Sequence, residues 1–361
     1  MSQQEILKPR QQAILKALVE DYIERAEPVA SKALVERHRL ELSSATVRNS
    51  LAELEQLGYL EQPHTSAGRV PTDAGYRVYV NSLMRPEELD EEEKAEIRGQ
   101  LGATFADLPE LLKRASLVLS EDTGYASLVL APKLGQSRIR QLKMLMIEPG
   151  RALLVVVLSA GLVKDRLCRI PDLLDQEQLL TIARALERRL GDSPIEEISL
   201  VTLTSALQDV ALPEAFLNQL LYETYVAIKQ AEQSETYMEG LPQLFRQPEF
   251  QASGQAGSLA QALAQRAYVS GILEAPVAEG ERVETVEEQP SGLVLRIGQE
   301  IASEPLRDCS FVTATYRSAE TIQGSIAVVG PKRMDYARVI PRIDFVRRQL
   351  GDLLDKERLD G

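Results

Sequence analysis

Residues 43–80 read SSATVRNSLAELEQLGYLEQPHTSAGRVPTDAGYRVYV, and this stretch decides the fold of the N-terminal part of the chain. Its first apolar side chains recur at intervals of four and three, at Val47, Leu51 and Leu54. That spacing places them on one face of an α-helix. Ser43 or Ser44 can cap the start of this helix, because a serine oxygen accepts a hydrogen bond from a first-turn amide. Gly58 stands just after the last apolar residue, where a helix commonly ends.

The outer, N-terminal part of this helix carries short or hydrogen-bonding side chains. These are Ser44, Ala45, Thr46, Arg48 and Asn49. Arg and Asn are suited to bidentate pairing with guanine and adenine, and small neighbours let a helix approach base edges closely. This face therefore predicts contact with a DNA major groove. Taken alone, the same residues also fit an ordinary solvated helix face, so the flanking segments have to decide between the two.

Two apolar segments precede this helix. The first has its stripe at Ile14, Leu15, Leu18, Val19, Tyr22 and Ile23. A shorter helix is predicted over residues 31–38, with Ser31 as its cap, and a connector at residues 39–42 leads on to the third helix. Three short helices with such a tight second connection form the helix-turn-helix pattern, in which the third helix recognises DNA.

A short hairpin follows the third helix. Residues 59–62 are predicted to form one strand and residues 69–70 the return, around a small polar tip. The tip and the return strand carry side chains suited to phosphate contact: His64, Thr65, Ser66 and Arg69. His64 is better explained as a loop residue than as a metal ligand, because the other histidine is His38 and no cysteine lies nearby. Helices and hairpin together predict a winged helix-turn-helix DNA-binding domain over residues 1–85.

These residues resemble a known family. The run SSATVRNSLAELEQLGYLEQPHTSAGRVPTDAGYRVYVNSLM is similar to the N-terminal region of the bacterial heat-inducible transcription repressor family HrcA. EPVASKAL upstream, and RIGQEIASEPLRDCSFVTATY and GPKRMDYARVIPRIDFV near the C-terminus, resemble the same family. The resemblance implies a repressor of heat-shock chaperone genes that binds an inverted-repeat operator in double-stranded DNA as a homodimer. It also implies that the GroEL chaperonin keeps the repressor active, so that unfolded protein relieves repression by occupying the chaperonin.

The charge of the chain is a caution for DNA binding. The formal net charge is −13, and acidic proteins are repelled by polyanions. Residues 1–85 hold 11 Lys and Arg and 11 Asp and Glu, so this part is neutral and the rest carries the acidic excess. Arg69, Arg77 and Arg85 against Asp73 give a small local basic footprint. We therefore expect modest non-specific affinity, a shallow dependence on salt and a need for two heads on one operator.

A chain of 361 residues is longer than one hydrophobic core usually supports, so an α+β multidomain fold is expected. Helical spacing after a charged run predicts a helical linker over residues 86–120. Short apolar runs at 121–174 and 286–361 predict strands, whereas 175–285 has helical spacing. This order predicts one sheet interrupted by an insertion. The family resemblance implies a GAF-like α/β domain over 121–174 and 286–361 that hosts a mainly helical dimerisation domain at 175–285.

The predicted insertion contains a candidate dimer interface. Its apolar side chains at helical spacing are Phe216, Leu217, Leu220, Leu221 and Tyr225. The same spacing is equally consistent with the internal core of the insertion. Dimerisation also has a reason apart from the resemblance, because two-fold symmetry lets two heads address a palindrome one or more helical turns apart.

Enzyme chemistry finds little support in the sequence. There is no Walker loop, no GxGxxG after a strand, no HExxH and no CxxC, and both histidines lie in the N-terminal region. Cys168 and Cys309 each stand in an apolar context that predicts buried, inert thiols. We therefore expect no catalytic residue, no metal and no cofactor.

Neither a run of about 18 apolar residues nor an apolar signal core occurs, so a cytoplasmic protein is expected. The alternative to a repressor governed by protein partners is a winged-helix regulator whose GAF-like domain binds a small-molecule effector. A ligand-dependent rise in thermal stability would favour that alternative.

Overall fold

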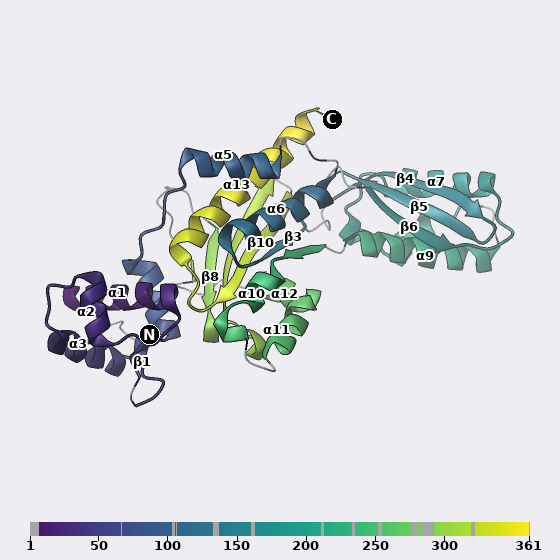
Figure 1. Ribbon diagram of the computed structural model, residues 1–361. Coiled ribbons are helices and arrows are strands. Elements are labelled where there is room, and N and C mark those ends of the chain that lie inside the picture. Colours follow the sequence, from purple (N-terminus) through teal and green to yellow (C-terminus); the bar gives the residue numbers. More distant parts are fainter. Residues whose placement is uncertain are drawn as a thin grey trace.

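The computed structural model describes residues 7–65, 67–102, 105, 107–132, 137–159, 163–210, 213–232, 235–251, 255–273, 275, 281–282, 292–318 and 322–360. Figure 1 shows three parts, which we call the head (residues 7–85), the body (the central sheet and the helices packed on it) and the insert (residues 137–232). The head and the insert lie at opposite ends of the body (Figure 1).

The head has the order of elements that the sequence predicts, which confirms the winged helix-turn-helix. Its elements are α1 (Pro9–Arg25), α2 (Ser31–His38), α3 (Ser44–Gln56), β1 (Leu60–Glu61), β2 (Val70–Pro71), α4 (Asp73–Val78) and the π-helical turn η1 (Tyr79–Leu83). The predicted stripe of Val47, Leu51 and Leu54 is buried where α3 packs on α1. Because one face of α3 is buried in this way, its other face is turned to solvent.

The body is built on a five-stranded antiparallel sheet in the order β7-β3-β10-β9-β8. Its strands are β3 (Ala126–Leu130), β7 (Thr236–Glu239), β8 (Leu293–Ile297), β9 (Cys309–Ser318) and β10 (Ile322–Pro331). Side chains of one strand alternate between two cores: on β10, Ile326 and Val328 join one, and Ala327 and Val329 join the other. The sheet is therefore covered on both faces.

Helices provide the two coverings. One group comprises α5 (Glu91–Leu101), α6 (Leu108–Thr123) and α13 (Tyr336–Asp360), with α13 against β9 and α6 against β3. The other comprises α10 (Leu241–Phe245), α11 (Gln255–Ala264) and α12 (Arg266–Leu273). Three short 3-10 turns complete the body: η3 (Pro248–Phe250), η4 (Gly298–Glu300) and η5 (Glu304–Leu306).

The insert leaves the body after β3 and returns at β7, and these two strands pair with each other. It holds a separate antiparallel sheet of β4 (Ile139–Glu148), β5 (Arg151–Leu158) and β6 (Val163–Arg169). Its helices are α7 (Gln176–Leu190), the 3-10 turn η2 (Ile195–Glu197), α8 (Leu200–Ala206) and α9 (Glu214–Glu232). α7 packs on β4 and α9 on β6, so the helices fill one face of this sheet.

The α+β multidomain class is as predicted, but the predicted division of the strands is wrong. Of residues 121–174, β3 does join the strands of 286–361 in the body sheet, but β4, β5 and β6 form a separate three-stranded sheet in the part of the chain that the structure describes. The insert is consequently α/β rather than mainly helical. Conversely, residues 236–273 lie inside the predicted insertion but supply β7 and α10–α12 to the body. The predicted linker 86–120 folds as α5 and α6, which pack on the body.

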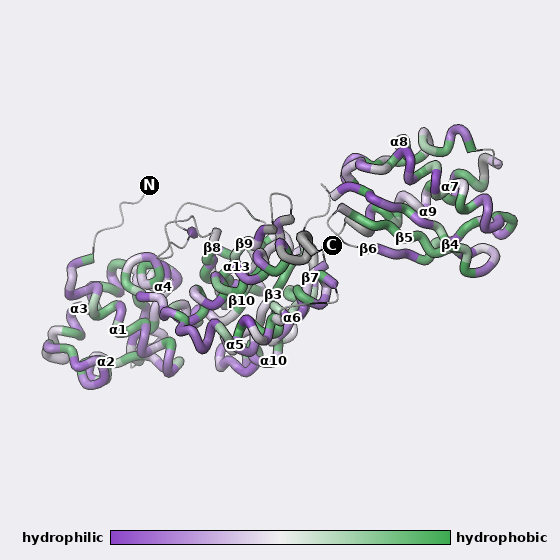
Figure 2. The backbone as a smooth tube through the Cα atoms, turned by 90° about the horizontal axis from the view of Figure 1, so that it is seen from above, coloured by the Kyte–Doolittle hydropathy of each residue, from purple (hydrophilic) through white to green (hydrophobic). Residues whose placement is uncertain are grey.

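Hydrophobic and hydrophilic stretches alternate along the chain in Figure 2, as expected of elements with one buried face. Within the part of the chain that the structure describes, no helix combines the length and the apolar character needed to cross a membrane.

Candidate nucleic-acid interface

The start of α3 is capped by Ser43, one of the two serines predicted for this role. Its hydroxyl accepts the Thr46 N–H at 3.1 Å and lies 2.8 Å from the Thr46 hydroxyl. The hydroxyl of Ser44 lies 3.2 Å from that of Ser31, the first residue of α2. Ser44 and Thr46 are half-buried, so these hydroxyls join α2 to α3 and fix the angle between the two helices.

The outer face of α3 is open. Ala45, Arg48 and Asn49 are exposed, and neither the Arg48 nor the Asn49 side chain makes a hydrogen bond or ion pair with any residue that the structure describes. The adjacent Arg48 and Asn49, with the small Ala45 three residues before Arg48, can approach base edges without first breaking an internal side-chain contact. All three residues are exposed, as the predicted helical rotation requires, and their contact with DNA stays a prediction.

The wing follows α3 in the chain and is tied to the end of that helix by an ion pair between Arg69 and Glu55. His64 and Thr65 are exposed at its tip, while the predicted Ser66 lies outside the described residues. The tip is shaped by Gln62, whose amide nitrogen donates to the carbonyls of Thr65 at 3.0 Å and Ala67 at 2.9 Å. The sequence analysis missed Gln62, because a glutamine that closes its own turn has no distinctive spacing.

Arg69 is less available than the sequence suggested. Its guanidinium makes two contacts of 2.9 Å with the Glu55 carboxylate of α3, and its backbone pairs with Val29 in both directions at 2.9 Å. This pairing requires Gly68, because a Cβ there would lie 2.4 Å from the Val29 backbone. The residue thus first fixes the wing against α3, and phosphate contact has to compete with Glu55.

The acidic residues of α3 are turned toward the head itself. Glu53 accepts a hydrogen bond from the Gln11 amide at 2.9 Å, and Glu55 is held by Arg69. Both carboxylates lie in the last turns of α3, away from its exposed N-terminal turns, and these partners partly compensate their negative charge. DNA contact is consequently favoured at the first two turns of α3, where Arg48 lies, over the last turn.

A buried carboxylate joins α1 to α2. Asp21 is 2% exposed and lies 2.7 Å from Arg37, 3.5 Å from Arg25 and 3.7 Å from His38. His38 is one of three basic side chains that surround this buried acid, so its role is to hold α1 and α2 together. Among the described residues, no group of three or more His, Cys, Asp or Glu side chains could hold a metal ion.

Arg77 does not belong to the basic footprint that the sequence analysis assigned to it. Only 9% of its surface is exposed, and its side chain reaches the Glu300 carboxylate of the body. Burial inside the chain removes this guanidinium from any contact with phosphate. The charge near the wing is therefore smaller than a count of arginines indicates.

The structure places the five residues predicted for dimerisation in the core of the insert. Leu220 and Leu221 are buried, and Phe216, Leu217 and Tyr225 are half-buried, on the α9 that packs against β6 and α8. The internal-core alternative therefore describes this stripe.

The face of the body sheet that α10–α12 cover is filled by side chains. Strand residues Leu128, Phe311 and Val329 pack there against helix residues such as Leu263 and Val269. A groove of about 560 Å³ does exist, but it lies on the other side, where α5 and α13 meet the segment that follows the head. Its walls carry both carboxylates and the basic side chains of Lys94 and Arg98, so their charge does not select one class of ligand.

The two thiols are buried, as predicted. Burial, with nearby Glu223, raises the pKa of Cys168 to about 11, and burial with Asp308 raises that of Cys309 to about 12. Both thiols are therefore neutral at pH 7, and a neutral thiol is a poor nucleophile.

Comparison with known proteins gives a consistent result. The HrcA winged helix-turn-helix transcription repressor DNA-binding domain matches residues 6–84, and the HrcA protein C terminal domain matches residues 109–340. The chain is 34% identical over 347 residues to the heat-inducible transcription repressor HrcA of Ruminiclostridium cellulolyticum, and 33% identical over 350 residues to that of Pelotomaculum thermopropionicum. These alignments cover 96% and 97% of this chain and 97% of each relative.

The fold is also similar to a solved one. A crystal structure of a hypothetical protein superposes with a TM-score of 0.61 at 24% sequence identity, covering 97% of this chain and 98% of that one. The similarity extends over head, body and insert together.

Proposed function

The chain belongs to the HrcA family of heat-inducible transcription repressors, and we propose that it binds an inverted-repeat operator as a dimer, each head reading one half-site. The family is one of DNA-binding repressors, which is not a class of enzyme. We place the protein in the cytoplasm, and its operators before chaperone genes, as the family resemblance implies.

The observation that carries the proposal is the open face of α3. Arg48 and Asn49 stand exposed on its first two turns, His64 and Thr65 are exposed at the wing tip, and the Arg69–Glu55 pair ties the wing to the same helix. In winged helices this arrangement brings base-reading side chains into the major groove while the wing contacts the backbone. α3 keeps this pose because Ser43, Ser44 and the apolar stripe fix its position in the head.

Duplex binding measured by fluorescence anisotropy tests this proposal. Arg48→Ala and Asn49→Ala should each weaken binding to the inverted-repeat operator by roughly 1–3 kcal/mol per half-site, and weaken binding to a scrambled duplex much less. Gln56→Ala is the matched control, because Gln56 is exposed on the last turn of the same helix. If both variants bind operator and scrambled DNA as the unaltered protein does, these residues do not read bases.

We further propose that the dimer forms through the open face of the insert sheet. The helices fill only one face of this sheet, and Figure 1 shows no helix in front of the other. Apolar side chains are exposed on the open face: Leu145 by 47%, Leu167 by 44% and Val163 by 59%. They flank Leu153 and Val157 of the central strand in cross-strand register. Exposed apolar surface of this kind marks an association site.

The charges on this face favour a second copy of the chain as its occupant. Lys143 of β4 and Asp165 of β6 stand on either side of Val155 in one cross-strand row. A two-fold axis along β5 would place β4 of one copy over β6 of the other, so that Lys143 meets Asp165 twice and Leu145 meets Leu167 twice. Such self-complementarity is what a two-fold interface requires.

Sedimentation of the full chain distinguishes this face from other surfaces. Val155→Glu should give a monomer, whereas Val201→Glu should leave the dimer intact, since Val201 is 74% exposed on α8. Lys143→Asp should weaken the dimer, and adding Asp165→Lys should restore it. A monomeric unaltered protein, or a dimeric Val155→Glu variant, would contradict the placement.

Control by the GroEL chaperonin is the part of the proposal that rests on family membership alone. If it holds, adding GroEL should raise the fraction of protein that binds operator, and an unfolded competitor should lower it again. If the fraction of protein that binds operator does not change when GroEL is added, control by the chaperonin is wrong, whereas the proposal of operator binding stands.

A further inference from the structure

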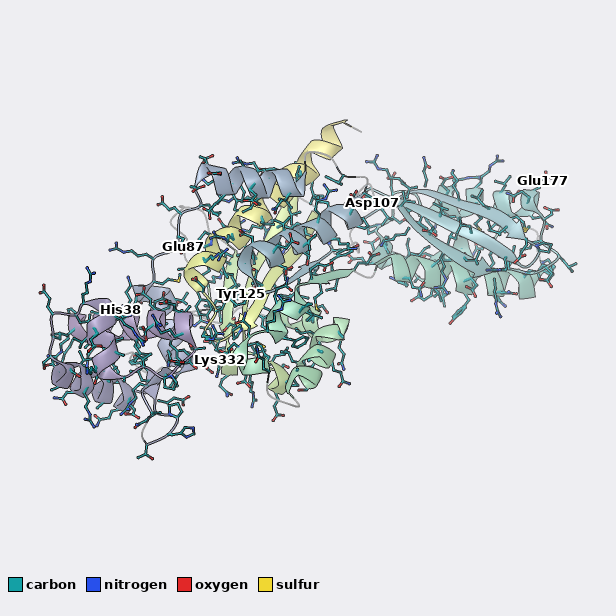
Figure 3. The ribbon with its side chains drawn as sticks, in the orientation of Figure 1. His38, Glu87, Asp107, Tyr125, Glu177 and Lys332 are labelled. Carbon is teal, nitrogen blue, oxygen red and sulfur yellow. The ribbon has the colours of Figure 1, made fainter. Side chains whose placement is uncertain are left out.

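The head is docked on the body through α4, the helix that follows the wing. At the centre of the junction Tyr76 is 2% exposed, and its ring meets that of Tyr336 edge-on with centroids 6.2 Å apart. Lys332 lies where the head meets the body in Figure 3, and its ammonium is 3.1 Å from the Asp73 carboxylate. The junction thus has an aromatic centre and a polar rim.

Arg77 supplies the strongest part of that rim. Its Nε donates to Glu300 at 3.1 Å, and its Nη2 donates to the second oxygen of Glu300 and to the Leu295 carbonyl at 2.7 Å. A planar guanidinium paired with both oxygens of one carboxylate fixes direction as well as distance. Glu300 also accepts the Ile297 N–H at 2.8 Å, so its carboxylate is held from the body side.

Asp73 adds a second directional contact one turn earlier. Its carboxylate accepts the Gln299 N–H at 2.9 Å. The turn comes this close because residue 298 is glycine with φ +53°, and a Cβ there would lie 2.2 Å from the carboxylate of Asp73. Arg77 and Asp73 therefore grip the same turn, η4, from one face of α4.

Two further contacts restrain the head. Arg333 donates to the carbonyl of Ile23, near the C-terminal end of α1, at 3.2 Å. The segment 84–90 is bound as well: Pro341 inside α13 has no N–H to donate to Ala337, and the Glu87 N–H fills that place at 2.9 Å. The head is thus held at α4, at α1 and at its exit.

We propose that Arg77 and Asp73 are positioning residues for operator binding, which set the half-site spacing that the dimer accepts. By clamping α4 to the body they fix the distance and the angle between the two recognition helices. This inference rests on the proposed function, because it needs a dimer that binds an inverted repeat. Arg77 cannot act by touching DNA, since it is buried against the body.

The dimensions of the junction make the effect measurable. Moving one half-site by about five base pairs displaces it by about 17 Å along the helix axis and turns its groove to the opposite side. A rigid dimer then binds with one head only. It loses the gain in affinity that the second, linked head supplies, a factor on the order of 10²–10⁴. A head freed at α4, at α1 and at Glu87 hangs on residues 84–90, which when extended span about 24 Å, enough to follow the shift.

The experiment compares operators of different spacing. Full-length protein, Arg77→Gln and Glu300→Gln are titrated against inverted repeats with half-sites moved in single base-pair steps, and against a duplex with one half-site. Glu300→Gln leaves the head sequence intact and replaces the carboxylate that pairs with Arg77 by a neutral amide, which should loosen α4 on the body. Glu304→Gln is the matched control, because Glu304 is an exposed carboxylate in η5 of the body.

The unaltered protein and Glu304→Gln should show a narrow optimum, with affinity falling on the order of 100-fold at the half-turn spacing. Both junction variants should keep the single half-site affinity, which shows that the head is folded, and should lose less than about tenfold at the half-turn spacing. A junction variant that keeps the narrow optimum overturns the inference. An unaltered protein that ignores the inverted repeat overturns the proposed function instead.

Discussion

Two helices of the head each carry an arginine and use it in opposite ways. On α3, Arg48 is exposed and its side chain makes no hydrogen bond or ion pair with the described residues. On α4, Arg77 is buried and satisfied by the Glu300 carboxylate and the Leu295 carbonyl. The difference separates a surface that is kept open for a ligand from one that is already occupied by the same chain. A buried charge with a partner serves geometry, whereas an open one can serve recognition.

The comparison predicts its largest effect on stability. Arg77→Ala leaves Glu300 without its partner at the junction and should lower the free energy of unfolding by about 3 kcal/mol, the low end for a broken buried pair because Glu300 is partly exposed. Arg48→Ala should change the same quantity by less than about 0.5 kcal/mol. Urea denaturation followed by circular dichroism measures both. Equal effects would show that the two arginines do not differ as described.

The wing offers a second way to sharpen the comparison. Gly68→Ala forces a Cβ into the Val29 backbone and should cost about 1–3 kcal/mol through overpacking. Operator affinity should fall as well, because the wing would no longer stand beside α3. Gly99→Ala in α5 is the control, since nothing lies within 4 Å of a Cβ added there. A Gly68→Ala variant with unchanged stability would mean that the wing adjusts freely.

A smaller effect, on the affinity for DNA, is expected at Arg69, whose guanidinium is paired with Glu55. Glu55→Gln removes the acid that holds Arg69 and frees its guanidinium for phosphate. Affinity for DNA of any sequence should rise, and the slope of log K against log salt should steepen by about 0.9 for each added phosphate contact. Anisotropy titrations over a range of salt concentrations test this. A weaker variant with an unchanged slope would show that Glu55 positions Arg69 for DNA rather than withholding it.

The smallest effect at neutral pH concerns the thiols. Burial raises the pKa of Cys168 from its ordinary 9.0 to about 11, so folding favours the neutral thiol. Its contribution to stability is complete below about pH 9 and is lost as the pH rises toward 11. Labelling with a thiol reagent at pH 7.5 should therefore require unfolding, for Cys309 as well. Rapid labelling of the native protein would show that these side chains are exposed.

Local features of the head could be predicted from sequence because each is encoded within a few residues. The stripe of Val47, Leu51 and Leu54 sets the face of α3, and Ser43 sets its start. The partition of the strands could not be predicted in this way. Apolar runs mark strands but do not name their partners, and β3 pairs with β10 across almost the whole length of the insert and much of the body.

The binding face was predictable for a similar reason, and its electrostatics were not. Arg48 and Asn49 follow from helical rotation, which sequence spacing gives directly. Arg69 and Arg77 look equally basic in the sequence, yet Glu55 engages one and Glu300 buries the other. Glu300 is far from Arg77 along the chain, so only the folded arrangement of head and body brings them together.

Protection of single cysteines by DNA tests the central claim most directly. Asn49→Cys places a thiol on the open face of α3, and Glu24→Cys places one at the end of α1, where 70% of the native side chain is exposed. With both native thiols buried, a maleimide should label only the introduced residue. Operator DNA should slow the labelling of Asn49→Cys and leave Glu24→Cys unaffected. Equal labelling of Asn49→Cys with and without bound operator would contradict the assignment of α3 as the recognition helix.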